Sequence, residues 1–178
     1  FIRRLIATRD ALTENFRAGA LEAMGLGYEV LARDNPRLIY CSLKGFLSGP
    51  YETRAALDEV VQMMGGLAYM TGPSGRPLRA GSSVNDIMGG MFAVIGILAA
   101  LQERARTGRG QFIKAGLFES NMLLVAQHMM QFAVTGTPAR PMPERIAAWA
   151  VYDVFDTSDG EQVFVGVVSD TQWAVFCD

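Results

Sequence analysis

Asp86 is the acidic residue of this sequence whose neighbours best suit covalent chemistry. It follows a short polar segment, residues 79–85, and directly precedes a glycine-rich apolar run that we expect to be helical. A carboxylate at a helix N-terminus is favoured in its ionised form by the helix dipole and by free backbone N–H groups. An ionised, accessible carboxylate can attack an activated carbonyl as a nucleophile. The same position also suits a helix N-cap, and from the local pattern alone the cap is the favoured interpretation.

Lys44 and the pair Asn15-Phe16 stand where two expected strands end. Lys44 closes an otherwise apolar strand in a chain whose basic residues are almost all arginine. Proteins of the α/β class bind ligands at the carboxyl ends of parallel strands. There a lysine would meet a phosphate or carboxylate, a phenylalanine would stack on a flat ring, and an asparagine would form hydrogen bonds. The structural alternatives are a solvated strand end for Lys44, and a strand end followed by a core aromatic residue for Asn15 and Phe16.

Strands and helices must alternate to bring these residues together. Strands are expected over 11–16, 37–46 and 111–117, and helices over 2–9, 18–24, 28–33, 57–69, 86–105 and 119–134. This alternation is typical of an α/β fold with a parallel sheet. The chain then changes character, with a proline-containing linker over 136–144, strands over 150–155 and 162–168, and a helix from about residue 170. We therefore expect a large α/β domain over 1–135 and the beginning of a smaller α+β domain over 145–178.

The expected helix over 86–105 is unusually rich in small residues. Glycine inside a helix costs about 1 kcal/mol relative to alanine. Gly89, Gly90 and Gly96 therefore predict close packing against another backbone. The most apolar part of this helix, Met88–Leu101, has 14 residues. That is shorter than the ~20 residues of a membrane span, so we expect a buried helix.

The composition excludes several classes of function. Half of the 178 residues are apolar and 19% are charged, which is typical of a globular protein and not of a disordered one. The net charge of −2 gives no electrostatic basis for a nucleic-acid or membrane partner. Two distant cysteines fit a cytoplasmic protein, and a single histidine argues against a zinc site, so no metal is expected. The Gly-x-Ser-x-Gly, Walker A and G-x-G-x-x-G motifs do not occur.

A series of short segments resembles the class III CoA-transferase family, also called the CaiB/BaiF type. The segments are 14–21 (ENFRAGAL), 24–28 (MGLGY), 35–42 (NPRLIYCS), 44–46 (KGF), 81–86 with Gly89, 96–101 (GILAAL) and 107–111 (TGRGQ). Each segment is weak alone, but the ordered series spans nearly the whole chain. The resemblance therefore favours a functional interpretation of Asp86 over the N-cap.

The resemblance implies a fold, an assembly and a reaction. The fold is a Rossmann-like large domain with a smaller domain, in a homodimer of two interlinked chains. Asp86 matches the family's nucleophilic aspartate, which moves coenzyme A (CoA) from an acyl-CoA thioester to a carboxylic acid through covalent aspartyl intermediates. Four positions match residues that contact CoA in the family: Asn15, Phe16, Met24 and Lys44. Lys44 would face a phosphate, and Phe16 and Met24 the adenine.

Two alternatives to a complete CoA-transferase stay open. The family's first strand and first CoA-binding loop would precede Phe1, and its glycine-rich loop would follow Asp178. We therefore expect a partial chain, which could be a non-catalytic fragment acting in folding, dimerisation or partner binding. The chain could also belong to a racemase or hydrolase of the same fold. Racemase-type members have histidine at the position that matches Leu57, which disfavours a racemase.

Overall fold

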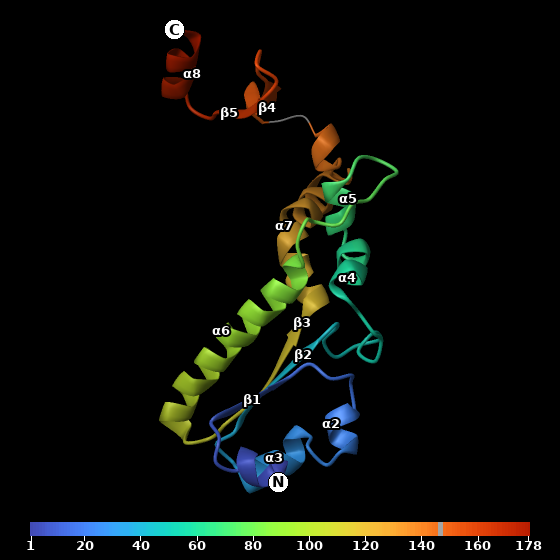
Figure 1. Cartoon of the computed structure of the whole chain (residues 1–178), viewed down its shortest axis with the longest axis vertical. Helices are drawn as coiled ribbons and strands as arrows, with labels where there is room; N and C mark the ends of the chain where they lie inside the picture. Colours follow the sequence, from blue (N-terminus) through green and yellow to red (C-terminus); the bar gives the residue numbers. More distant parts are fainter. Residues whose placement is uncertain (146–147) are drawn as a thin grey trace. The chain divides into compact units, whose positions relative to one another are not determined.

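Figure 1 shows the computed structural model of the chain, which describes residues 1–145 and 148–178. The chain divides into two compact units, Phe1–Pro143 and Glu144–Asp178. Every residue proposed above for chemistry lies in the first unit. That the two units correspond to a large and a small functional domain stays a prediction.

The first unit is built on a three-stranded sheet in the order β1 (Ala11–Glu14), β2 (Ile39–Lys44), β3 (Phe112–Gly116). Both strand pairs are parallel, which confirms the expected α/β class with a parallel sheet. The central strand β2 is buried over its first four residues, as expected for an apolar strand covered on both faces. Because all three strands run the same way, Glu14, Lys44 and Gly116 lie at one edge of the sheet.

Helices connect and cover these strands. Those of the first unit are α1 (Ile2–Ile6), α2 (Ala20–Ala23), α3 (Tyr28–Asp34), α4 (Asp58–Met64), α5 (Leu67–Thr71), α6 (Val84–Thr107) and α7 (Leu117–Thr135), followed by a 3-10 turn, Met142–Glu144. The single helix expected over 57–69 is wrong, because α4 and α5 are separate. Gly66 between them has a φ of 85°, in the left-handed region that interrupts a right-handed helix.

Two apolar clusters lie on opposite faces of the sheet, because successive strand residues point to opposite faces. One cluster contains Tyr40 of β2 together with residues of the first three helices and their loops: Ile6, Leu21, Leu31 and Leu38. The other contains Cys41 of β2, packed with Ala93 of α6 and Ala115 of β3. Helix α6 thus covers one face along β2 and β3, as Figure 1 shows.

The small residues of α6 allow the helix to approach side chains of the β3 region. A Cβ at Gly96 would lie 2.9 Å from the Ile113 side chain, and one at Gly89 would lie 3.2 Å from Leu117. The expected close approach to another backbone is therefore wrong, since the neighbours at both glycines are side chains. Gly90 faces open space and takes no part in this packing.

The expectation of a buried helix holds for only one face of α6. Its opposite face exposes a row of apolar residues: Ile87, Met91, Val94, Ile95 and Leu98. The helix has 24 residues and a mean hydropathy of 1.8 in its most apolar window, which meets the length and composition needed to cross a membrane. The apolar stretch of α6 is thus longer than the sequence run suggested. Core helices of other proteins meet the same criterion, so length and composition alone are weak support for a span.

The second unit consists of a hairpin and a helix, as the sequence predicts. Strands β4 (Val151–Asp156) and β5 (Gln162–Val167) pair antiparallel, and α8 (Asp170–Cys177) follows. Ser169 is the N-cap of α8, and its hydroxyl accepts a hydrogen bond from the Gln172 N–H at 3.2 Å. This local capping explains where the helix begins.

Two glycine-to-alanine substitutions should have opposite effects on stability. Gly110 donates its N–H to the Pro36 carbonyl at 2.9 Å, and a Cβ there would lie 2.0 Å from the Leu38 carbonyl oxygen. Because that neighbour is backbone, Gly110→Ala should lower the free energy of unfolding by about 1–3 kcal/mol. Gly90→Ala should raise it by about 0.5–1 kcal/mol, since it adds helix propensity in open space. Urea denaturation of both variants checks this, and a Gly110→Ala variant as stable as the wild type would contradict the packing described.

Candidate active site

A cavity of about 920 Å³ lies at the carboxyl edge of the parallel sheet. It is lined by residues that follow β1, end β2 and begin α4 and α6, among them Asn15, Phe16, Arg17, Lys44, Gly45, Glu52, Arg54, Leu57, Asp58, Glu59, Ser83 and Asp86. Ligands of α/β proteins bind at this edge, because strand ends and helix N-termini converge there. The fold therefore brings together four of the five residues that the sequence singled out.

Asp86 lies in the first turn of α6, which begins at Val84. Its side chain is exposed and lines the cavity. Ser83 occupies the N-cap position, so the N-cap interpretation of Asp86 is wrong. Within residues 1–145 and 148–178, no hydrogen bond or ion pair is formed by the Asp86 carboxylate. The carboxylate is thus left available to a ligand in the cavity.

Asp58, the first residue of α4, caps α6 from a distant part of the chain. Its side chain is 3% exposed, and Oδ1 accepts hydrogen bonds from the N–H groups of Asn85 at 2.7 Å and Asp86 at 3.4 Å. The other oxygen, Oδ2, accepts from Gln62 Nε2 at 2.5 Å. Gln62 in turn accepts from the Ala80 N–H at 2.7 Å. This network fixes the loop and the helix start that carry Asp86, and it satisfies helix N–H groups to which the N-cap residue, Ser83, gives no side-chain hydrogen bond.

The electrostatic surroundings of Asp86 differ from the sequence expectation. The pKa of Asp86 is raised, first because of partial burial and then because of the nearby carboxylates of Asp58 and Glu59. We expected the helix N-terminus to favour the charged form, and the raised pKa shows that burial and like charges outweigh it. An aspartate with a raised pKa holds its charge less favourably, which makes it a stronger base and nucleophile when ionised.

Asn15 and Phe16 reach the cavity from the end of β1, and Lys44 from the end of β2. The Phe16 side chain is 53% exposed, which excludes the core position given as its structural alternative. The structural alternative for Lys44 was a solvated strand end. It does not hold, because the Lys44 ammonium is paired with Glu14 at 2.8 Å. Met24 is 62% exposed at the end of α2 and does not line the cavity.

Sequence reasoning overlooked Asp58, Glu59 and Arg54. Asp58 and Glu59 are the acidic first turn of α4, a common feature of helix starts, so their types alone did not indicate a site. Their position after the central strand was the available signal, because helices that follow parallel strands begin at the ligand-binding edge. Arg54 stands over the Tyr51 ring at 4.7 Å and adds positive charge to the cavity lining.

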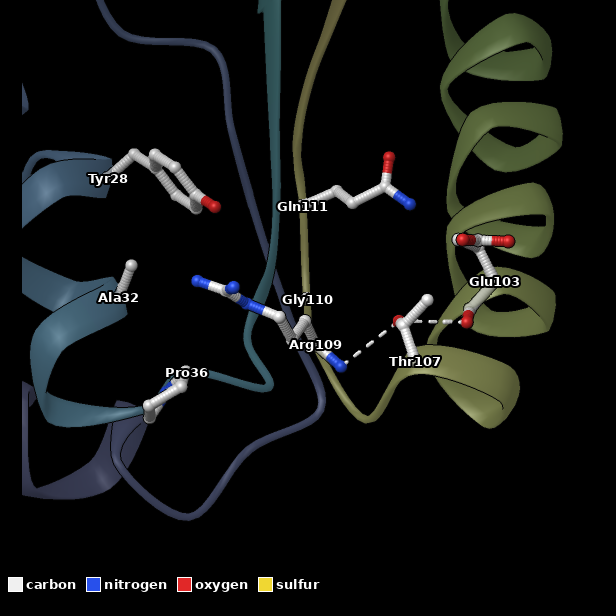
Figure 2. A pocket seen from close by; sticks show the side chains of 8 residues that line it. All are labelled: Tyr28, Ala32, Pro36, Glu103, Thr107, Arg109, Gly110 and Gln111. Atoms are coloured by element: carbon white, nitrogen blue, oxygen red, sulfur yellow. Dashed lines mark hydrogen bonds between the residues drawn. The ribbon is translucent and has the colours of Figure 1, made fainter.

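A second cavity, of about 410 Å³, lies at the opposite edge of the sheet. Figure 2 shows it between α3, which presents Tyr28 and Ala32, and the end of α6, which presents Glu103 and Thr107. Thr107 Oγ1 donates to the Glu103 carbonyl at 3.0 Å and accepts from the Arg109 N–H at 3.2 Å, which closes the helix end. These contacts belong to the turn that joins α6 to the amino end of β3.

The arrangement of the His, Cys, Asp and Glu side chains bears on whether the chain could hold a metal ion. In the part of the chain that the structure describes, no group of three or more His, Cys, Asp or Glu side chains is placed to hold a metal ion. The acids around Asp86 are instead used as hydrogen-bond acceptors or lie open to the cavity. The chemistry available in this cavity is thus that of carboxylates, one aromatic ring and a few cations.

Comparisons with known proteins agree with this picture. The chain is 37% identical to "Succinate--glutarate CoA-transferase" of Agrobacterium fabrum, over 99% of this chain and 44% of that protein. It is 39% identical to "Acetyl-CoA:oxalate CoA-transferase" of Acetobacter aceti, over 87% of this chain and 41% of that protein. The chain therefore spans less than half the length of the curated relatives it matches.

Solved structures and a family model extend the match. A CAIB/BAIF family protein from Brucella suis superposes with a TM-score of 0.88 at 39% identity, covering 98% of this chain and 46% of that one. A hypothetical protein from Mycobacterium tuberculosis superposes with a TM-score of 0.83 at 28% identity, covering 99% of this chain and 47% of that one. The model described as "CoA-transferase family III" matches residues 1–178. The resemblance in the sequence is thereby confirmed, and this chain belongs to CoA-transferase family III.

Proposed function

We propose that the complete protein transfers CoA from an acyl-CoA thioester to a carboxylic acid, with Asp86 as the covalent nucleophile. The observation that carries this proposal is the Asp86 carboxylate, which lines the carboxyl-edge cavity and has no hydrogen-bond or ion-pair partner within residues 1–145 and 148–178. Asp58 supports it by taking over the hydrogen bonds at the helix start. Membership in CoA-transferase family III supports the same reaction class.

The proposed reaction consists of four acyl transfers. The Asp86 carboxylate attacks the thioester carbonyl, which forms a mixed anhydride and releases CoA thiolate. The thiolate then attacks the aspartyl carbonyl, which forms an aspartyl-CoA thioester and releases the donor as a carboxylate. The acceptor carboxylate attacks this thioester, again giving a mixed anhydride and thiolate. Attack of the thiolate on the acceptor carbonyl yields the new acyl-CoA and regenerates Asp86.

The cavity lining fits the chemical groups of an acyl-CoA. The exposed Phe16 suits a flat base, and the Asn15 side chain offers N–H donors and a carbonyl acceptor. Arg17 and Arg54 add positive charge for phosphates or carboxylates. We propose that Asn15, Phe16, Met24 and Lys44 all contribute to CoA binding, by direct contact or through a neighbouring residue. Met24 lies outside the cavity lining, so its contact requires the ligand to extend beyond the cavity toward α2.

We further propose that the acceptor is a small dicarboxylic acid. The relatives named above act, by name, on succinate, glutarate and oxalate. Arg17 and Arg54 would supply a counter-charge for the second carboxylate. The homodimer and the Rossmann-like topology implied by the resemblance remain part of this proposal.

Covalent capture tests the proposal directly. The complete protein is incubated with succinyl-CoA and then with hydroxylamine, which intercepts an activated aspartyl carbonyl as a hydroxamate, and peptide mass spectrometry locates the label. We expect the label on Asp86 and CoA transfer to glutarate or oxalate. If neither a label on Asp86 nor CoA transfer is detected, the proposal is overturned in favour of a non-catalytic protein. Exchange of the α-proton of a 2-methylacyl-CoA in deuterium oxide without transfer would overturn it in favour of a racemase.

CoA should stabilise the folded protein. A ligand that binds only the native state raises the free energy of unfolding, by about 2.7 kcal/mol at 100 times its dissociation constant. We expect the thermal midpoint to rise with CoA concentration and to rise less with pantetheine, which lacks the nucleotide. An unchanged midpoint at millimolar CoA would contradict CoA binding in this cavity.

A further inference from the structure

Glu14, Ser42 and Lys44 form a buried polar cluster at the carboxyl edge of the sheet. Glu14 lies opposite Ser42 in the β1–β2 register. Ser42 and Lys44 are two residues apart in β2, so their side chains lie on the same face of the strand. The Glu14 and Lys44 side chains are 5% and 15% exposed. Buried charges are tolerated when they are paired and fully hydrogen-bonded, and this pair meets that condition.

The hydrogen bonds of this cluster use every donor of the lysine. Lys44 Nζ donates to both Glu14 carboxylate oxygens at 2.8 Å and to the Phe16 carbonyl at 2.5 Å. A lysine ammonium has three N–H donors, so none is left over for a phosphate. The Glu14 carboxylate also accepts from the Ser42 hydroxyl and from the Phe16 N–H, the latter at 2.8 Å. Lys44 can therefore reach an anion only by breaking this network.

Phe16 is the residue that the cluster holds in place. Glu14 accepts its N–H and Lys44 donates to its carbonyl, so both polar groups of its backbone are fixed by buried side chains. Phe16 as a whole, in contrast, is 53% exposed, and it lines the cavity. An apolar ring held on a fixed backbone at a cavity wall is preorganised to stack on a flat ligand group.

We propose that Glu14 and Lys44 are positioning residues that fix Phe16 for ligand stacking, and that Lys44 contributes to binding through this contact and not as a phosphate ligand. The inference rests on the proposed function, in that CoA is taken as the ligand of the cavity. It gives Lys44 an indirect role in place of the phosphate contact that the resemblance implied. It also assigns a role to Glu14, whose buried carboxylate accepts hydrogen bonds from Lys44 and from the Phe16 N–H.

Glu14→Gln distinguishes the two roles by the sign of its effect. If Lys44 were a phosphate ligand, removing the negative charge beside it would strengthen CoA binding. If the pair positions Phe16, the new amide places an N–H against the donors of Lys44 and Phe16, and binding weakens. We expect a roughly threefold to tenfold higher Kd for CoA by isothermal titration calorimetry, the size of one lost stacking contact. Tighter or unchanged binding by Glu14→Gln would overturn the proposal.

A double-mutant cycle with Phe16→Ala separates positioning from a structural role. Lys44→Met leaves Glu14 buried without its cation, so the neutral double variant Glu14→Gln/Lys44→Met serves as the version expected to fold. If the pair acts through Phe16, this double substitution weakens CoA binding in the wild-type background and adds nothing in the Phe16→Ala background. Equal losses in both backgrounds would show that the pair acts independently of Phe16.

Amide hydrogen exchange at Phe16 tests the positioning without any ligand. The Phe16 N–H should exchange faster in Glu14→Gln and in the double variant than in the wild type, whereas the buried Ile39 N–H, bonded to the Asp10 carbonyl, should not change. Unchanged exchange at Phe16 overturns the positioning even if CoA binds. If the Phe16 N–H exchanges faster in the variants but the wild type does not bind CoA, the positioning role stands and the proposed function is overturned.

Discussion

Replacing Asp86 with asparagine is expected to abolish covalent capture and to lower CoA transfer by about 10³-fold or more. Removal of a covalent nucleophile has effects of this order or larger, because the remaining groups only bind and orient the substrate. Asparagine keeps the size of the side chain but cannot form the anhydride or the aspartyl thioester. The Asp86 carboxylate lies open on the cavity, so the substitution leaves no buried group without its partner.

The same substitution should leave stability unchanged or slightly higher at neutral pH. Burial, Asp58 and Glu59 raise the pKa of Asp86 in the folded protein above its ordinary value of 3.8. The folded state therefore binds this proton more tightly than the unfolded chain does. The resulting stabilisation is complete below the unfolded pKa and is lost as the pH rises through the folded pKa. Asparagine does not ionise, so Asp86→Asn does not lose this stabilisation. The free energy of unfolding of the variant, measured by urea titration, should therefore exceed that of the wild type by an amount that grows from acidic to neutral pH.

Asp34→Asn is a suitable control for this experiment. Asp34 ends α3 in an exposed ion pair with Arg3 at 2.6 Å and does not line the cavity at the carboxyl edge. An exposed pair of this kind contributes about 0–1 kcal/mol, and its loss should leave hydroxamate formation unchanged. Hydroxamate formation retained in Asp86→Asn and lost in the control would contradict the assignment of the nucleophile.

The sequence predicted the sheet and the position of most site residues, because both depend on local patterns. Apolar strands alternating with helices require a parallel sheet, and a parallel sheet gathers residues at its carboxyl ends. The sequence places Asn15, Phe16 and Lys44 at strand ends and Asp86 at a helix start, and all four line one cavity. Met24 was named through the family resemblance, and the structure does not bring it into that cavity.

What could not be predicted depends on contacts between distant residues. The hydrogen bonds from Asn85 and Asp86 to Asp58 join positions 27 and 28 residues apart, and no periodicity in either segment encodes them. Local reasoning therefore gave the cap to Asp86 itself. The pairing of Lys44 with Glu14 likewise requires the β1–β2 register, which is a property of the assembled sheet.

Asp58 is the position at which a single substitution should change both stability and chemistry. Its buried carboxylate accepts three hydrogen bonds, from Gln62 and from the N–H groups of Asn85 and Asp86. Asp58→Asn replaces one acceptor with a donor that faces the Gln62 amide. Rotating the Gln62 amide would only transfer the mismatch to the Ala80 N–H. We expect the free energy of unfolding to fall by about 1–3 kcal/mol, the cost of one buried polar group left unsatisfied.

Asp58→Asn should also lower the pKa of Asp86, because it removes a neighbouring negative charge that raises it. The pH at which hydroxamate formation is half-maximal should therefore move downward. Glu59→Gln is the matched comparison, because Glu59 also raises the pKa of Asp86 but is 43% exposed and caps no helix N–H group in the described part of the chain. It should move the pH profile in the same direction while changing stability by less than about 0.5 kcal/mol. If Glu59→Gln destabilised the protein as much as Asp58→Asn, charge near the helix start, and not the cap, would account for the role of Asp58.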